Sequence, residues 1–433
     1  MPIPRWADAP DETPALITAS RTWTRREIDA AVRARVERWG SAPRIAIVGA
    51  ASVEHVLDLL AAIEAGIPAL MIHPRWTRSE TDAIVSRFAP SFVVDGGLVR
   101  TELGSAAPLE GVLAVVATSG TSGAPKLAVL SRRAFVASAN ASATHLGHHP
   151  HDRWLLAMPL AHVGGLGVVV RSIVYGTPIV LHEGDPSSWL PLARAASATH
   201  VSLVPTALAR MLDRDETFPP SVRVALVGGA ACPERVLERA IASGVPIHLT
   251  YGLTETCGQV ATTRIDPRTL VPLPGVELRI AGGTIRVRSP AAMDGWLDSE
   301  SPFDSDGFYD TGDVGELDQG HLTIHARRTD LVVSGGENVY PREVEDVLER
   351  IAGVRAACVF GEPDLEWGQR VAAAIVVDGA PSDEEIVRRA RKRLSGFKVP
   401  RRIARLEALA LNGTGKIDRA ATAALATPLL RSI

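Results

Sequence analysis

The sequence predicts an α/β fold in two parts, and two changes of pattern along the chain carry that prediction. Through the first two thirds, short apolar runs that are typical of buried strands alternate with amphipathic runs that are typical of helices. This alternation favours a large domain of βα-layered parallel sheets. After Arg327 the pattern changes to a compact α+β tail. We therefore expect a large domain over residues 1–327 and a small C-terminal domain over 328–433, joined at about 327–331, which suits a length of 433 residues.

The expected strands of the large domain are short apolar runs followed by a turn or a helix-like segment. They occupy 44–49, 112–117, 179–181, 200–205, 224–227 and 247–250. The expected helices include 55–65, a segment ending near 196, 206–212 and 233–243. From Leu278 to Ile324 the runs are shorter and contain many glycines and Asp-Gly pairs, which is typical of antiparallel strands. We expect that region to form a small β-barrel-like part.

The expected small domain begins with a strand, a glycine turn and an amphipathic helix. Residues 331–333 are the predicted strand, and Gly335 and Gly336 lie in the turn. The helix is predicted over 343–350 because apolar residues recur at helical spacing on one face. Those residues are Val344, Val347, Leu348 and Ile351.

Composition excludes several classes of protein. A formal net charge of −3 offers no general attraction to nucleic acid, and no apolar stretch reaches the roughly 18 residues of a membrane helix. The first residues run into acidic, proline-rich sequence, from which we expect no signal peptide. Cys232, Cys257 and Cys358 are scattered, with neither metal-ligand spacing nor a disulfide framework. These features fit a reducing cytoplasm.

Residues 118–126 are the most informative run of the chain. After an apolar strand they bring together four hydroxyl side chains, two glycines and a lysine: Thr118, Ser119, Gly120, Thr121, Ser122, Gly123 and Lys126. Glycine lets backbone N–H groups turn toward an anion, and the hydroxyl and ammonium groups add donors. The run can therefore hold a polyphosphate, although a surface loop could have the same composition. It is not a Walker A loop, because Pro125 precedes Lys126 and Leu127 follows it.

Four further motifs follow in the second half of the chain. They are Tyr251–Glu255, Gly307–Asp313, Arg327–Asp330 with Ser334–Pro341, and Asn412–Lys416. The first lies at the end of a predicted strand, where a doubly wound sheet usually places its ligand site. Taken singly, the first could also be an ordinary turn, and the second could be a hairpin with a solvated Asp313.

Together the five motifs resemble those of the adenylate-forming superfamily, which includes acyl-CoA synthetases, luciferases and peptide-synthetase adenylation domains. The resemblance covers roughly residues 12–420 and keeps the motifs in order. It implies that 118–126 closes over the phosphates of ATP, that Thr254 contacts phosphate and that Glu255 helps to hold Mg²⁺. It also implies that Lys416 reaches across the domains to the substrate carboxylate and the α-phosphate.

The same resemblance implies the rest of the nucleotide and coenzyme A sites. Tyr251 would pack on adenine, while Asp313 and Arg327 would bind the ribose, since a carboxylate can accept two hydrogen bonds. The resemblance also assigns Gly229 and Gly252 to the nucleotide site, and Gly252 to the acid as well. Gly335 and Gly336 would let the pantetheine arm of CoA pass close to the backbone.

The implied chemistry has two steps and uses ATP, Mg²⁺ and CoA. A carboxylate attacks the α-phosphate of ATP to give an acyl-adenylate and pyrophosphate, and catalysis is mainly positioning and electrostatics. The small domain, which the resemblance implies is mobile, then rotates about the hinge, removes Lys416 and presents the CoA tunnel. The thiol displaces AMP, so no protein nucleophile is required.

The segments 160–176 and 200–206 resemble the o-succinylbenzoate–CoA ligases of menaquinone biosynthesis. In that group an arginine nine residues after a motif histidine lies close to the second carboxylate of the substrate, and Arg171 has that spacing from His162. An unpaired charge in an apolar stretch is costly. Arg171 could instead form a structural ion pair. His162 is expected in the pocket or at its gate, or as a core histidine.

Three residues depart from the family pattern, and several alternatives stay open. Ala161 replaces a common aromatic residue, Gly164 a common serine and Thr329 a common hinge aspartate. Another aryl- or dicarboxylic-acid–CoA ligase, or an adenylation enzyme that loads a carrier protein, would share the motifs. A P-loop NTPase is disfavoured by the absent Gly-Lys-Ser/Thr, and a non-catalytic binding protein by the presence of Lys416 and Glu255. A homodimer is one candidate for the oligomeric state.

Overall fold

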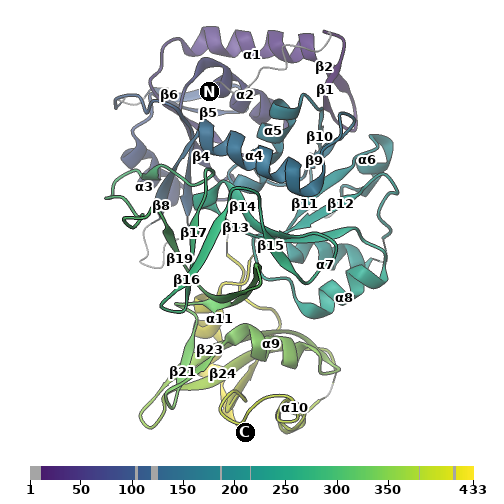
Figure 1. Cartoon of the computed structure of the whole chain (residues 1–433), viewed down its shortest axis with the longest axis vertical. Helices are drawn as coiled ribbons and strands as arrows, with labels where there is room; N and C mark the ends of the chain where they lie inside the picture. Colours follow the sequence, from purple (N-terminus) through teal and green to yellow (C-terminus); the bar gives the residue numbers. More distant parts are fainter. Residues whose placement is uncertain are drawn as a thin grey trace.

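The computed structural model describes residues 11–102, 106–118, 125–185, 188–214, 216–379, 381–412 and 416–433. In these residues the strands form sheets of thirteen, seven and six strands. Figure 1 shows an elongated molecule in which the two larger sheets and helices α1–α8 form the upper bulk. The six-stranded sheet lies below them, at the C-terminal end of the molecule.

The thirteen-stranded sheet is parallel at its centre. In order across the sheet, the parallel strands are β1 (Pro14–Ile17), β10 (Ile179–Leu181), β9 (Trp154–Leu156), β11 (His200–Leu203), β12 (Val224–Val227) and β13 (Ile247–Leu253). β2 (Thr22–Thr24) adds an antiparallel edge strand. Four of the six predicted strands lie in this sheet and are confirmed. The carboxyl ends of β11, β12 and β13 point to one edge, where a ligand site is expected.

The seven-stranded sheet is also parallel at its centre. Its parallel strands are β5 (Phe92–Asp95), β3 (Ile45–Val48), β4 (Ala69–Ile72) and β7 (Val112–Thr118). Antiparallel β6 (Leu98–Glu102) closes one edge, and β8 (Lys126–Ser131) and β18 (Gly295–Trp296) close the other. The predicted strands at 44–49 and 112–117 are confirmed.

Helices cover both larger sheets, as βα alternation requires. They are α1 (Arg25–Trp39), α2 (Val53–Ala65), α3 (Arg78–Phe88), α4 (Arg132–Leu146), α5 (Val163–Tyr175), α6 (Leu190–Ala195), α7 (Pro205–Asp213) and α8 (Glu234–Ala242). The main apolar core joins the two sheets, and it includes Met71 of β4, Leu156 of β9 and Leu166 of α5, each almost fully buried. None of the helices in the described ranges is long and apolar enough to span a membrane.

The region expected to be barrel-like is an antiparallel extension of the thirteen-stranded sheet. Beyond β13 the order is β14 (Gly258–Thr263), β15 (Leu270–Pro272), β20 (His321–Arg327), β19 (Tyr309–Asp318), β17 (Thr284–Arg288) and β16 (Glu277–Ala281). The antiparallel prediction is confirmed, but no closed barrel forms among the described strands. The physical reason is that β13 pairs with parallel β12 on one side and antiparallel β14 on the other, so the meander lengthens an existing sheet.

The six-stranded sheet and its helices form the C-terminal part. The elements are β21 (Val332–Ser334), β22 (Glu337–Val339), α9 (Pro341–Glu349), β23 (Val354–Asp364), β24 (Gly368–Val377), α10 (Asp383–Ala390), β25 (Arg402–Arg405), α11 (Arg419–Ala426), η2 (Thr427–Leu429) and β26 (Arg431–Ser432). Val344 and Leu348 of α9 are fully buried in their own core, as the helical spacing predicts. The domain boundary at 327–331 stays a prediction.

Candidate active site

Tyr251, Asp313 and Arg327 meet although they come from three different strands. The hydroxyl of Tyr251 in β13 donates to Oδ2 of Asp313 in β19 at 2.6 Å. Nη1 of Arg327, at the end of β20, donates to Oδ1 of Asp313 at 2.7 Å and to the carbonyl of Thr311 at 2.6 Å. Asp313 is only 8% exposed, so it is not the solvated hairpin residue that the motif alone would allow. Burial, together with the neighbouring Asp313 carboxylate, raises the pKa of the Tyr251 hydroxyl.

Glu255 lies in a short 3₁₀ turn, η1 (Thr254–Thr256), directly after β13. Its Oε1 accepts a hydrogen bond of 3.1 Å from the hydroxyl of Tyr309, and its backbone carbonyl accepts one of 2.7 Å from the N–H of Met293. Burial and then the Glu255 carboxylate raise the pKa of Tyr309. A phenol thus orients the carboxylate, and no cation of the described residues forms an ion pair with it. Sequence reasoning missed Tyr309, although it lies within the quoted Gly307–Asp313 motif.

Lys416 brings a cation from the C-terminal part of the chain to this group of side chains. Its amide N–H donates to Oδ1 of Asn412 at 3.0 Å, and its carbonyl accepts from the N–H of Asn412 at 2.8 Å. We call the antiparallel pairing of 410–412 with 416–418 the Lys416 hairpin. Its Cε and Nζ lie 3.7 and 4.0 Å from the point where a Cβ on Gly229 would be. Burial and then the Arg327 charge lower the pKa of Lys416, and the Glu255 carboxylate opposes them.

His162 is half-buried and lies beside the buried His73, near enough to Lys416 for that charge to act on it. His162 is the N-cap residue of α5, and its ring centroid lies 5.0 Å from that of His73, which is 2% exposed. Burial, then the His73 and Lys416 charges, lower the pKa of His162 to about 3. His162 is therefore neutral at ordinary pH, and its ring can donate one hydrogen bond and accept another without carrying charge. His73 was not singled out from the sequence.

Arg171 is a buried cation without an ion pair to a carboxylate in the part of the chain that the structure describes. It is 4% exposed, and Nη2 donates to Oε1 of Gln259 at 2.9 Å. Its guanidinium carbon lies 4.8 Å from the ring centroid of Trp154, and its Nε has no hydrogen-bond partner. The structural ion pair considered from the sequence is therefore not what holds Arg171. Gln259 and Trp154 were both missed.

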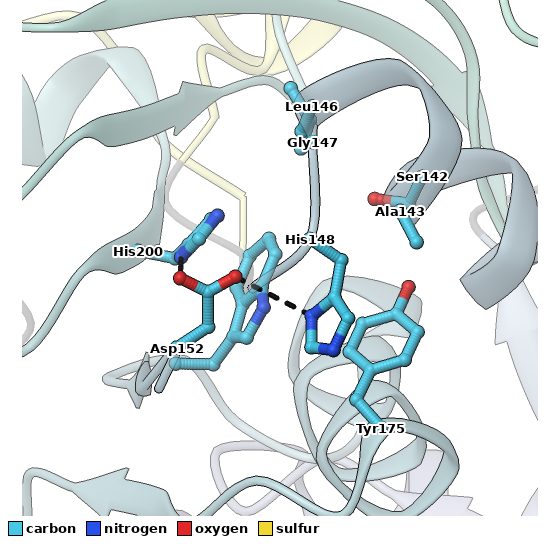
Figure 2. A pocket seen from close by; sticks show the side chains of 9 residues that line it. Ser142, Ala143, Leu146, Gly147, His148, Asp152, Tyr175 and His200 are labelled. Carbon is cyan, nitrogen blue, oxygen red and sulfur yellow. Dashed lines mark ion pairs between the residues drawn. The ribbon is translucent and has the colours of Figure 1, made fainter. Parts of the chain in front are cut away.

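A polar cluster supports Trp154 from behind. His200 stacks on the indole with ring centroids 4.5 Å apart, and its Nδ1 lies 2.8 Å from Oγ1 of Thr199. Figure 2 shows Asp152 between His200 and His148, with Tyr175 beyond His148. The cavity that these residues line measures about 10 Å³, which is room for about one water molecule and far too little for an aromatic acid. This cluster is therefore a supporting wall and not the substrate pocket.

The predicted glycines have different structural roles. Gly229 has a φ of +81°, which only glycine adopts readily, and it lies against Lys416. A Cβ on Gly252 would come within 1.8 Å of the Gly258 carbonyl oxygen, so the sheet itself demands that glycine. Gly335 and Gly336 have φ of +60° and +83° in the hairpin between β21 and β22, and a Cβ on Gly335 would lie 2.6 Å from the Trp367 ring.

The run 118–126, which the sequence predicts to hold phosphate, is only partly described. Ser119, Gly120, Thr121, Ser122 and Gly123 lie outside the described residues. Thr118 ends β7 and Lys126 begins β8, and these two residues pair across an antiparallel hairpin. A strand, rather than a helix, therefore follows the loop, which agrees with the exclusion of a Walker A motif. Nζ of Lys126 lies 5.2 Å from the ring centroid of Trp296.

Family models match two segments of the chain. The model of the AMP-binding enzymes matches residues 100–297, and the model of the C-terminal domain of AMP-binding enzymes matches residues 343–416. A relative named 2-succinylbenzoate–CoA ligase, from Bacillus mycoides, is 36% identical over 334 residues, which are 72% of this chain and 69% of that protein.

Solved structures of o-succinylbenzoate CoA synthetase from Bacillus subtilis are also similar. The complex with its acyl-adenylate intermediate is 29% identical, with a TM-score of 0.87 over 96% of this chain and 97% of that one. The complex with ATP and magnesium ion has the same score and identity over 97% and 99%. A double mutant bound to a product analogue is 29% identical over 97% and 98%, but its TM-score is only 0.70.

Proposed function

This chain belongs to the family of AMP-binding enzymes, and on that premise we propose that it is an o-succinylbenzoate–CoA ligase. The reaction consumes o-succinylbenzoate, ATP and CoA and yields o-succinylbenzoyl-CoA, AMP and pyrophosphate. The observation that carries the proposal is the position of Lys416, which lies against Gly229 and close enough to Arg327 and Glu255 for their charges to act on its pKa. That set of charges suits a reaction at a phosphate.

In the first step a carboxylate oxygen of the acid attacks the α-phosphorus of ATP, and the bond to the pyrophosphate oxygen breaks. Negative charge on the reacting phosphate is held by Lys416, which carries its ammonium to the Gly229 turn. The lowered pKa of this lysine reflects desolvation, and removal from water strengthens its interaction with an anion. His162, being neutral, adds a hydrogen bond without repelling that ammonium.

The ribose and metal contacts follow from the strand ends. Asp313 is fixed by Tyr251 and Arg327, and each of its oxygens keeps a second lone pair for a ribose hydroxyl. Glu255 would hold Mg²⁺, since a carboxylate that only a phenol orients is a hard oxygen ligand. Bound there, the ion would neutralise phosphate charge. No cluster of three or more metal-ligating side chains occurs within the described ranges, so nucleotide oxygens would complete the coordination.

The second carboxylate of the acid is assigned to Arg171. The buried guanidinium of Arg171 donates to a neutral amide and lies over an indole, and no carboxylate of the described residues neutralises it, so its charge is available to an anionic ligand. A planar fork also suits a carboxylate better than an ammonium does. A monocarboxylic acid of similar size would leave that charge without a partner, so the site should discriminate in favour of a dicarboxylate.

In the second step the CoA sulfur attacks the acyl carbon, and the bond to the AMP oxygen breaks. Gly335 and Gly336 lie on β21–β22, and Figure 1 shows β21 farther from the large domain than α11, which follows Lys416. The described orientation therefore suits the first step. The lower TM-score against the product-analogue complex than against the adenylate complex agrees with this assignment. Rotation at the hinge would exchange the two faces.

An assay of pyrophosphate release across a panel of acids, with and without CoA, tests the proposal. We expect release that depends on o-succinylbenzoate, and acyl-CoA only when CoA is present. If the enzyme prefers another dicarboxylate, that acid becomes the assigned substrate. If it requires a carrier protein, that protein and not CoA is the thiol acceptor. We also expect a cytoplasmic enzyme, because the three cysteines are free thiols. A homodimer stays a prediction.

A further inference from the structure

We propose that Arg419 is a positioning residue that fixes the Lys416 hairpin relative to the hinge. This proposal rests on the proposed function, because the position of Lys416 matters only for that reaction. Arg419 lies three residues after Lys416 and begins α11. Its side chain is 24% exposed, and the partners that it contacts within the described residues are not among the groups assigned to the chemistry.

The guanidinium of Arg419 joins three separate segments. Its Nε lies 3.4 Å from Oδ2 of Asp330, the residue directly after the predicted hinge position Thr329. Its Nη1 donates to Glu345 of α9 and to the carbonyl of Val359 in β23. Because Asp330 also accepts a 3.2 Å bond from the Thr329 hydroxyl, Arg419 is connected directly to the hinge.

Hydrogen bonds join the base of the hairpin to α11. The amide N–H of Asp418 donates to the Ala410 carbonyl at 2.9 Å, and Leu411 bridges Ile417 across the hairpin. Oδ1 of Asp418 accepts from the N–H of Ala421 at 2.9 Å and so caps the helix. A shift of Arg419 therefore moves the base of the hairpin and, with it, Lys416.

The charges around Arg419 favour simultaneous contacts with Asp330 and Glu345 over a single ion pair. We call these two contacts the Arg419 clamp. Glu345 is 3% exposed and also accepts 2.9 Å from the Val359 amide, while Arg342 approaches its second oxygen at 3.7 Å. Burial disfavours the charge of Arg419, but Glu345, Cys358 and Asp330 together outweigh that effect and raise its pKa. The fork can serve Asp330 and Glu345 at once because its donors are fixed in one plane. A single ammonium cannot.

This arrangement matters because adenylation is sensitive to small displacements. A misplacement of about 1 Å can cost about 100-fold in rate. Lys416 must return to the same position each time the small domain rotates, and Arg419 ties it to the point about which rotation occurs. Thioester formation does not use Lys416, so loss of the clamp should affect the two half-reactions unequally.

Arg419→Lys, measured in each half-reaction, tests the proposal. We expect adenylation, followed by pyrophosphate release, to fall by about 10- to 100-fold. Thioester formation from supplied o-succinylbenzoyl-adenylate and CoA should fall by less than about threefold. The matched control is Arg402→Lys, which breaks a contact with Glu362 in the same domain but touches neither hinge nor hairpin. Equal losses in both half-reactions, or losses matched by the control, would overturn the proposal.

Hydrogen exchange gives a readout that does not depend on the acid. The amides of Asn412, Lys416 and Asp418 should exchange faster in Arg419→Lys, while those of β24 should be unchanged. If the parent protein adenylates no acid, the proposed function fails, but this comparison still decides the role of Arg419. Unchanged exchange at all three amides would show that Arg419 does not hold the hairpin.

Discussion

The carboxylate assigned to Arg171 can be tested by supplying a competitor from within the protein. Gln259 is 4% exposed and offers Oε1 to Arg171 at 2.9 Å. Gln259→Glu changes that amide to a carboxylate of nearly the same shape, which would neutralise the guanidinium. The second carboxylate of o-succinylbenzoate would then lose a charge-assisted partner, typically about 1.5–3 kcal/mol. That range corresponds to about 10- to 150-fold in kcat/KM.

The discriminating assay compares o-succinylbenzoate with the monocarboxylic analogue that the parent enzyme adenylates. Gln259→Glu and Arg171→Leu should each reduce kcat/KM for the dicarboxylate by that factor and leave the analogue within about threefold. The two changes should not be additive, because both remove the same charge. Gln259→Met is the neutral control. It should reduce kcat/KM for the dicarboxylate by a smaller factor than Gln259→Glu does. Equal losses for both acids would mean that Arg171 supports the fold and does not select the substrate.

Three further predictions concern the other parts of the site. Lys416→Ala should abolish pyrophosphate release yet leave thioester formation from supplied acyl-adenylate largely intact, and near-normal release would disprove the assignment. Thr329→Pro should fix φ near about −65° and restrict Arg328. If this holds the small domain in the orientation described above, the enzyme should release pyrophosphate on the first turnover while thioester formation falls by orders of magnitude. Parental rates in both half-reactions would exclude a hinge at Thr329. The folded-state pKa of His162, about 3, lies below its ordinary 6.5, so its contribution to stability is complete above about pH 6.5 and is lost toward pH 3. When the pH falls from about 7.5 to about 5, the free energy of unfolding of the parent should therefore drop by about 2 kcal/mol more than that of His162→Gln. An equal drop in both proteins would show that the fold does not lower the pKa of this imidazole.

Local patterns sufficed for most of the individual elements. Apolar runs located strands such as β3 and β7, and the spacing of Val344 and Leu348 located the buried face of α9. The arrangement of the antiparallel strands was not predictable in the same way. Nothing in the local alternation of residues 278–324 tells whether the meander closes on itself or extends a sheet. That depends on β13 pairing with β12 and β14 at once.

In the site too, motifs predicted single residues but not the contacts between residues that are distant in sequence. Tyr251 and Asp313 were each predicted from a motif, but their hydrogen bond spans 62 residues of sequence and only the fold reveals it. Gln259 is 88 residues from Arg171, and Trp154 has no motif that marks it as a cation-binding ring. Gln259 does lie four residues after Glu255, so its closeness to a predicted site residue was the available signal. Arg419 was likewise close to Lys416 in sequence, although its partners were not.

The central claim is that the acid is activated as an acyl-adenylate, and isotope transfer tests it most directly. We would supply o-succinylbenzoate with isotopically labelled carboxylate oxygens, unlabelled ATP and CoA, and analyse the products by mass spectrometry. The account predicts AMP that carries one labelled oxygen, because the carboxylate oxygen that attacks the α-phosphorus leaves with AMP when the thiol attacks. Unlabelled AMP, or label in a phosphate released alongside ADP, would contradict it.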